Sequence, residues 1–215
     1  RSPSDFEAVL SKLKYKNTSD APNTAARKLT LTVTDTSGGG ETAASSPAEL
    51  TLTVTGENDR PVITNWPASA SYSEGATDVT VLAAGLELSD ADAADAAKGP
   101  LSEAVVVFSG YVADEDEFKF GAATVVAGET GVDVGSGIKL ASDDAQGTLT
   151  LTLSAASGGS TAAEFQAVLR TLTYKNKNQT DLAARERKLT LTVTDTSGSG
   201  TATSSAAELT LKVTG

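Results

Sequence analysis

The sequence predicts an all-β fold, a Greek-key β-sandwich repeated along the chain, with one short helix inserted between strands of each repeat. Two observations predict it: long stretches of sequence recur, and several segments alternate Leu or Val with Thr. Composition sets the kind of core. Hydrophobic residues make up 39% of the chain and aromatic residues 5%, so the core is built mainly from Leu, Val and Ala. Because each small side chain buries little area, stability has to come from many strands.

The internal repeat sets the domain organisation. Residues 27–38 and 187–198 both read RKLTLTVTDTSG. FEAVLSKLKYKN at 6–17 matches FQAVLRTLTYKN at 165–176, and AELTLTVTG at 48–56 matches AELTLKVTG at 207–215. A period of about 159 residues indicates a duplicated fold. We therefore expect 57–215 to be one complete repeat.

By the same alignment, residues 1–56 are the C-terminal third of a preceding repeat. An isolated third of a sandwich cannot bury its own apolar face. We expect this segment to be completed by further chain, to pack loosely, or to swap between molecules.

Strands are predicted wherever apolar and polar residues alternate, because that period places one face on the core and the other in solvent. Thr on the outer face suits a solvated strand, since it is polar and β-branched. The clearest cases are Leu29/Leu31/Val33, Leu50/Leu52/Val54, Leu149/Leu151/Leu153, Leu189/Leu191/Val193 and Leu209/Leu211/Val213. Further strands are expected around 61–64, 77–88, 103–110, 117–126 and 137–142.

A short helix is predicted in each repeat. Phe165, Val168, Leu169 and Leu172 fall at i, i+3, i+4 and i+7, the spacing of one helix face. Upstream, Thr161 stands three residues before Glu164, the signature of a capping box. The segment from Ser2 to Leu13 repeats this arrangement. We expect the apolar stripe to face the core.

Composition excludes several classes of function. The chain has no Cys and no His, which excludes disulfides, thiolate metal sites and cysteine nucleophiles, and removes the usual general base and zinc ligand. A net charge of −11 repels nucleic acid and anionic membrane surfaces but attracts cations. No run approaches the roughly 20 apolar residues of a membrane span. We expect neither nucleic-acid binding nor direct membrane insertion.

Acidic residues recur at the ends of predicted strands and between the repeats. They are Asp59 in ENDRP, which follows the amide Asn58, Glu74 in SEG, Asp90 and Asp92 in SDAD (extended by Asp95), and the strand-ending Asp35 and Asp195. Ca²⁺ takes six to eight oxygen ligands, mostly carboxylates with amide or backbone oxygens. Asp and Asn are also ordinary turn residues, so both interpretations, calcium ligands and solvated turn acids, stay open.

Other polar features have simpler expectations. The run Asp114-Glu115-Asp116-Glu117 is expected to be an exposed, self-repelling loop. Paired carboxylates also occur in glycosidases, but here they lie on linkers and strand ends with only Trp66 and few other aromatics to hold a sugar. We expect no enzymatic activity. Asn17 and Asn178 begin N-x-S/T sequons and are candidate glycosylation sites if the source is eukaryotic.

The order of these motifs carries a resemblance to a known family. VTDTSGG at 33–39, ENDRP at 57–61, SYSEG at 71–75 and LSDADAAD at 88–95 together resemble the cadherin-type repeat. More closely, they resemble the cadherin-like or Ig-like tandem modules of large bacterial-type surface adhesins. The resemblance implies an extracellular, cell-surface protein that binds Ca²⁺ where one repeat meets the next. It places Asn58, Asp59, Asp90, Asp92 and Asp195 at the junction between the two repeats, Glu74 at the following junction and Asp35 at the preceding one.

The function implied is structural: a calcium-stiffened spacer or fibre segment in cell adhesion, whose partners are neighbouring repeats of the same chain. Two alternatives remain open. Loops 90–100 or 111–117 could form a recognition module for a surface carbohydrate or protein, or copies of the chain could polymerise into a filament or lattice.

Overall fold

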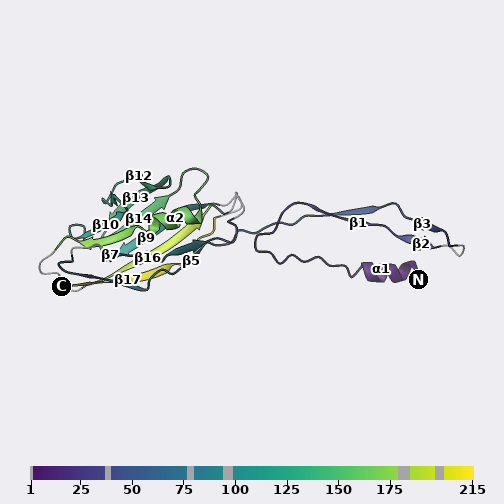
Figure 1. Cartoon of the computed structure of the whole chain (residues 1–215), viewed down its shortest axis with the longest axis horizontal. Coiled ribbons are helices and arrows are strands. Elements are labelled where there is room, and N and C mark those ends of the chain that lie inside the picture. The colour runs from purple at the N-terminus through teal and green to yellow at the C-terminus, as the bar shows by residue number, and fades with distance from the viewer. Residues whose placement is uncertain (1, 37–39, 77–79, 94–98, 179–184, 197–200) are drawn as a thin grey trace. The chain divides into compact units, whose positions relative to one another are not determined.

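The chain consists of two compact units, Arg1–Glu57 and Asn58–Gly215, which are shown in Figure 1. The computed structural model describes residues 2–36, 40–76, 80–93, 99–178, 185–196 and 201–215. Each unit is treated separately below.

The second unit is built from three sheets. The largest has the strand order β12-β13-β14-β9-β16-β17-β6, the next has the order β11-β10-β15-β7, and β5 pairs with β8. All pairings are antiparallel except that of β17 with β6, which is parallel. The strands are β5 (Val62–Thr64), β6 (Ser69–Ser73), β7 (Thr80–Val81), β8 (Glu87–Ser89), β9 (Leu101–Ser109), β10 (Asp116–Phe120), β11 (Ala123–Thr124), β12 (Val132–Gly135), β13 (Ile138–Ala145), β14 (Thr148–Ser154), β15 (Leu172–Asn176), β16 (Arg185–Asp195) and β17 (Ala207–Thr214).

The core of this unit lies between the large sheet and the four-stranded sheet. Along β14, Leu149, Leu151 and Leu153 are buried while the threonines between them are half-buried, as the two-residue period of a strand requires. Aromatic rings from both sheets meet in the middle. The ring of Phe108 on β9 lies 4.4 Å, centroid to centroid, from that of Phe118 on β10. The predicted β-sandwich is therefore confirmed (Figure 1).

Helix α2 (Ala162–Leu169) connects β14 to β15, so the expected helix between strands is confirmed. Phe165, Val168 and Leu169 are its buried residues. Leu172, which the helical spacing included, instead begins β15. The reason is that the chain leaves the helix at Arg170, after which pairing with β10 and β7 takes over.

The capping box of α2 is formed as the sequence predicts. Thr161 Oγ1 accepts a hydrogen bond from Glu164 N at 3.2 Å, and Thr161 N donates to Glu164 Oε2 at 2.8 Å. Thr161→Ala should therefore lower the free energy of unfolding by about 1 kcal/mol, measured by urea denaturation. Ser157→Ala, in the exposed loop before the helix, is the matched control and should leave stability unchanged. Equal losses in both variants would show that the cap contributes nothing.

The strands agree with the sequence in most places and differ in several. The stretch 117–126, expected as one strand, contains β10 and β11, and β3 (Thr42–Ala44) was not predicted. The stretch 77–88, expected as one strand, contains two short strands, β7 and β8, that join different sheets; residues 77–79 lie outside the described ranges. β6 and β12 were not predicted. β6 reads SASYS, and small polar residues give little alternation. Only Tyr72 in β6 is fully buried, so its signal in the sequence is a single residue.

The first unit contains one helix and two hairpin-like pairs of strands. Its elements are α1 (Pro3–Leu10), β1 (Arg27–Leu31), β2 (Thr34–Thr36), β3 (Thr42–Ala44) and β4 (Ala48–Leu52). β1 pairs with β4 and β2 with β3, both antiparallel. None of the α1 residues is buried, so no core forms beneath the helix. Across the described ranges of both units, no helix has the length and apolar character needed to cross a membrane.

Candidate cation site in the second unit

The strand pairing brings acidic residues from three separate segments together. Asp90 directly follows β8, Asp195 ends β16, and Asn58 and Asp59 precede β5. Because β5 pairs antiparallel with β8, with Val62 opposite Ser89, the segment before β5 lies beside the segment after β8.

Hydrogen bonds connect these segments directly. Asn58 Nδ2 donates to Asp195 Oδ2 at 2.7 Å, and the backbone N–H of Asp59 donates to Asp92 Oδ2 at 2.8 Å. The N–H of Asp92 donates to Asp90 Oδ1 at 2.8 Å. We call Asn58, Asp59, Asp90, Asp92 and Asp195 the acidic cluster. The structure brings these five predicted residues together.

Three of the four carboxylates of the cluster are withdrawn from solvent, and Asp59 is half-buried. The exposed fractions of Asp90, Asp92 and Asp195 are 8%, 1% and 0%. Burial raises the pKa of Asp90 above its ordinary value, and the negative charges of Asp195, Asp92 and Asp59 raise it further, against a lowering effect of the hydrogen bond from Asp92 N. Negative charge is therefore concentrated here at a cost in free energy.

Asp90 has a carboxylate oxygen that is buried without compensation. Asp90 Oδ2 has no hydrogen-bond partner, and within the described ranges no Lys or Arg forms a salt bridge with Asp90, Asp92 or Asp195. A buried carboxylate oxygen without a donor is expensive, and a cation would remove the cost. Carboxylates with an amide oxygen are the donor set that Ca²⁺ prefers.

The side chains are not arranged as a closed ligand sphere. No group of three or more described acidic residues has a geometry that could hold a metal ion as it stands. Both oxygens of Asp195 accept a hydrogen bond, from Asn58 Nδ2 and from Ala202 N at 2.9 Å. Gly99 lies against the backbone of Asp92. A Cβ on Gly99 would collide with the backbone of Asp92, so only glycine allows this close approach.

The remaining predicted site residues lie elsewhere. The half-buried Glu74 follows β6, and its N–H donates to the carbonyl of Thr214 near the end of the chain. Asp35 is in β2 of the first unit, where Oδ1 accepts from Ala43 N at 3.2 Å. Neither joins the acidic cluster. Asn17 is exposed, and its Oδ1 accepts from Ser19 N. The sequon that begins at Asn178 continues outside the described residues, and Asp95 also lies outside them.

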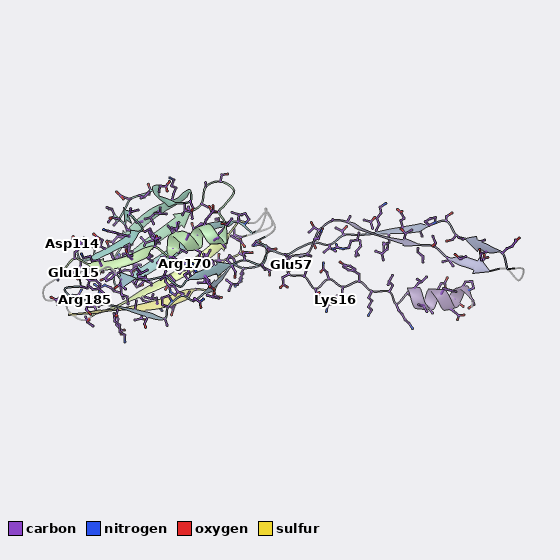
Figure 2. All side chains as sticks on the ribbon, viewed as in Figure 1. Lys16, Glu57, Asp114, Glu115, Arg170 and Arg185 are labelled. Atoms are coloured by element: carbon purple, nitrogen blue, oxygen red, sulfur yellow. The ribbon has the colours of Figure 1, made fainter. Side chains whose placement is uncertain are left out.

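The expectation for the acidic run 114–117 is wrong for its most important member. Asp116 begins β10 and is 3% exposed. Its Oδ2 accepts from Arg187 Nε at 3.0 Å, and its Oδ1 accepts from Tyr174 Oη and from Asn176 Nδ2. Figure 2 shows Asp114 and Glu115 at the same end of the second unit as Arg185. The signal in the sequence was the alternation of Asp116, Phe118 and Phe120, which places the acid on the inner face.

Arg187 is the charged partner at the centre of this network and is 2% exposed. Its Nη1 and Nη2 make no hydrogen bond, and Nη2 lies 3.9 Å from Glu115 Oε2. Burial, together with the hydrogen bond to Asp116, raises the pKa of Tyr174. These residues form a buried ion pair with polar support, which is a structural element of the core.

Comparison with known proteins gives no family assignment. No protein-family model and no curated protein matches the sequence. Among solved structures, the chain is similar to the protocadherin gammaB7 EC3-6 cis-dimer structure, at 16% identity and a TM-score of 0.35. It is also similar to extracellular cadherin domains 3–6 of protocadherin gamma B2, at 15% identity and a TM-score of 0.36. Each match covers 87% of this chain and 32% of the other. Similarities this distant support no inference about function.

Proposed function

We propose that this chain is a non-catalytic structural and adhesion module of an extracellular tandem-repeat protein, and that Ca²⁺ bound by the acidic cluster stiffens it. The observation that carries the proposal is the cluster itself, in which hydrogen bonds link Asn58 to Asp195, Asp59 to Asp92 and Asp92 to Asp90. Within it, Asp90 Oδ2 is buried without a hydrogen-bond partner. The motif order of the sequence, with its resemblance to cadherin-like modules, points the same way.

The place of the cluster in the chain suggests how a cation would act. Asn58 is the first residue of the second unit, and it is tied by hydrogen bonding to the end of β16. Asp59 is likewise tied to the loop after β8. A bound Ca²⁺ supplies positive charge that neutralises these carboxylates. The first residues of the unit would then be held firmly to two loops, which would fix the direction in which the chain enters the sandwich.

A recognition role for loop 111–117 is less well supported. Asp116 is buried, Val112 N donates to its Oδ2 at 2.8 Å, and Lys177 N donates to the Glu115 carbonyl. This loop is therefore committed to contacts within the unit. The other candidate loop, 90–100, contains members of the acidic cluster and extends outside the described residues.

Calcium should raise the melting temperature of the chain. A ligand that binds only the folded state adds about 2.7 kcal/mol at one hundred times its dissociation constant, which corresponds to an increase of roughly 5–10 °C for a protein of this size. Circular dichroism recorded during heating, once with Ca²⁺ and once with a chelator, gives the melting temperature in each condition. Small-angle scattering should show a narrower distribution of lengths with Ca²⁺. If neither melting nor scattering responds to Ca²⁺, the proposal is wrong.

The Asp90→Asn variant distinguishes the effect of Ca²⁺ binding from the effect of the buried negative charge. The folded pKa of Asp90 is raised, so the charged side chain destabilises the fold at pH values above that pKa, and this cost disappears as the pH falls through it. In chelator at pH 7 the variant should therefore melt higher than the wild type, whereas its response to Ca²⁺ should be smaller. Asp143→Asn, at an exposed position of β13, is the control and should keep the wild-type response to Ca²⁺.

A further inference from the structure

The first unit has the local structure of the last third of the second unit. In β1 and β4, Arg27 lies opposite Leu52, and in β16 and β17 Arg187 lies opposite Leu211. These are equivalent positions of the repeat, so the register is the same. An ion pair also recurs: Lys28 Nζ lies 3.1 Å from Glu49 Oε2, and the equivalent Lys188 Nζ lies 2.6 Å from Glu208 Oε1.

The same detail is repeated beyond the strands. Val33 N donates to Ser45 Oγ at 3.0 Å, and the equivalent Val193 N donates to Ser204 Oγ at 3.0 Å. Ser2 and Asp5 form a capping box at the start of α1, as Thr161 and Glu164 do for α2. The first unit therefore shares its strand register, an ion pair and a helix cap with the last third of the second unit.

What differs is the covering of the apolar face. In the second unit, residues 58–160 cover this face, and the side chains on it are at most 4% exposed. In the first unit the equivalent side chains are between 38% and 68% exposed. The pairs are Phe6 and Phe165, Val9 and Val168, Leu10 and Leu169, Leu13 and Leu172, Tyr15 and Tyr174, Leu31 and Leu191, Val33 and Val193, and Leu50 and Leu209.

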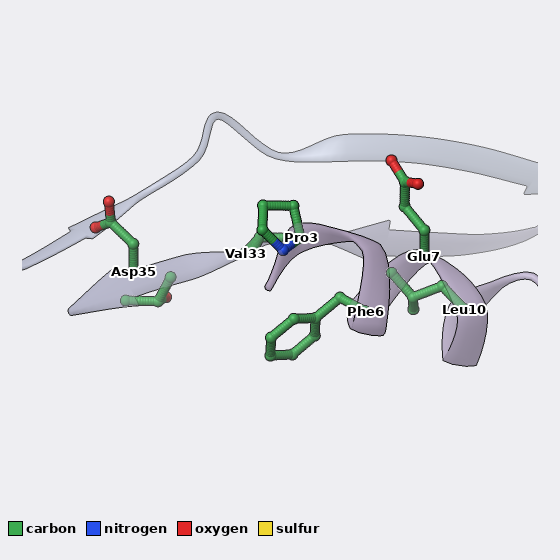
Figure 3. A pocket seen from close by; sticks show the side chains of 7 residues that line it. Pro3, Phe6, Glu7, Leu10, Val33 and Asp35 are labelled. Atoms are coloured by element: carbon green, nitrogen blue, oxygen red, sulfur yellow. The ribbon is translucent and has the colours of Figure 1, made fainter. Parts of the chain in front are cut away.

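The exposed face contains a groove. Pro3, Phe6 and Leu10 of α1 line it on one side, and Val33 and Asp35 line it on the other, as Figure 3 shows. Its volume is about 620 Å³. Leu10, Leu29 and Leu50 help to line a second hollow of about 310 Å³. In the second unit, the residues equivalent to Phe6, Leu10 and Val33 are in the core.

The strand edges of the first unit are also open. In the second unit, β16 pairs with β9, β17 with β6, and β15 with both β10 and β7. All four of these partners belong to residues 58–160. Residues 13–17 are equivalent to β15 but form no strand. A strand requires a partner for its backbone hydrogen bonds, and no described strand of the first unit pairs with residues 13–17.

Three polar side chains of the first unit indicate which group a covering segment would carry. Tyr15, Asn17 and Arg27 are equivalent to Tyr174, Asn176 and Arg187, the three side chains that bind Asp116. Arg27 has no carboxylate in salt-bridge range among the described residues. Its guanidinium carbon instead lies 5.8 Å from the centroid of the Tyr15 ring. The first unit thus presents a carboxylate-binding set without the carboxylate.

We propose that the first unit is a docking surface for a strand block of the same repeat type, equivalent to residues 58–160 and supplied by polypeptide preceding it. The acid at the Asp116 position of that block would bind Arg27, Tyr15 and Asn17, and β6- and β9-type strands would pair with the open edges of β4 and β1. This proposal does not depend on calcium binding.

The test adds the partner to the chain as it exists. A second copy of residues 58–159 is placed before Arg1, and amide hydrogen exchange is measured at Leu29, Leu31 and Tyr15. Protection in the extended chain should rise by about 100-fold or more over the unextended chain, because these amides would become part of a cooperative core. Leu189 and Leu191 in the second unit serve as an internal reference and should not change.

Specificity is tested by variants in the added copy. Asp116→Asn there should reduce the gained protection by about 100-fold, as expected for a broken buried ion pair. Glu117→Gln, which affects a half-exposed pair with Lys119, is the control and should reduce it less than about threefold. The proposal is overturned if 2–57 exchanges as fast in the extended chain as without the extension. It is also overturned if the unextended chain dimerises with protection of Leu29, since the occupant would then be a second molecule.

Discussion

Replacing Asp116 by alanine should lower the free energy of unfolding of the second unit by about 3–5 kcal/mol, because it removes the close counter-ion of the buried Arg187. Only Glu115 would remain, with its Oε2 3.9 Å from Arg187 Nη2. The loss extends beyond the ion pair. Tyr174 Oη and Asn176 Nδ2 each lose an acceptor, and so does Val112 N. Urea denaturation followed by far-ultraviolet circular dichroism measures the change as a shift of the midpoint at constant slope.

The neighbouring surface pair provides the control. Lys188 follows Arg187 on β16, and its pair with Glu208 is about half exposed on both sides (52% and 57%). Glu208→Ala should therefore cost only about 0–1 kcal/mol. A double variant, Asp116→Ala with Arg187→Met, should recover some of the loss, since the buried charge is gone. A loss below about 1 kcal/mol in Asp116→Ala would contradict the buried pair.

Phe165→Ala should cost about 3–5 kcal/mol, as expected for removing a buried aromatic side chain. Phe165 lies on α2 with an exposed fraction of 0%. The repeat offers an unusually close control, Phe6, which has the same position on α1 but is 47% exposed. Phe6→Ala should change stability by less than about 0.5 kcal/mol.

Thermal and urea denaturation of both variants compare one residue type at one position of the repeat in two environments. Equal losses would mean that the first unit buries Phe6 in solution, which contradicts the exposed apolar face. In a chain extended by a second copy of residues 58–159, the cost of Phe6→Ala should rise toward that of Phe165→Ala, because the added block would cover α1.

Much of the sandwich could be predicted from sequence because its strands have strong period-2 patterns. Leu149, Leu151 and Leu153 are buried as expected, and so are Leu189, Leu191 and Val193. The capping box at Thr161 and Glu164 placed the helix. Prediction failed where burial depends on a distant partner. β6 has Tyr72 as its one fully buried residue, and its place in the large sheet comes from β17, more than a hundred residues away.

The acidic residues show the same limit. That Asn58, Asp90 and Asp195 lie together depends on the pairing of β5 with β8 and on the end of β16, which was inferred from motif order rather than from local sequence. Asp116 was missed because a run of four acids is usually exposed. Its burial requires Arg187, which is 71 residues away in the chain, and local patterns do not report such a pairing.

The parallel pairing of β6 with β17 has a mechanical consequence. From Ser69 opposite Thr210 to Ser73 opposite Thr214, the two strands run in the same direction, one near the beginning of the second unit and the other at its end. A pull applied between Asn58 and Gly215 would draw β6 and β17 in opposite directions along their common axis. The backbone hydrogen bonds between the two strands would then be loaded together in shear and would not break one after another from an end. This pair of strands would therefore resist a tensile load collectively.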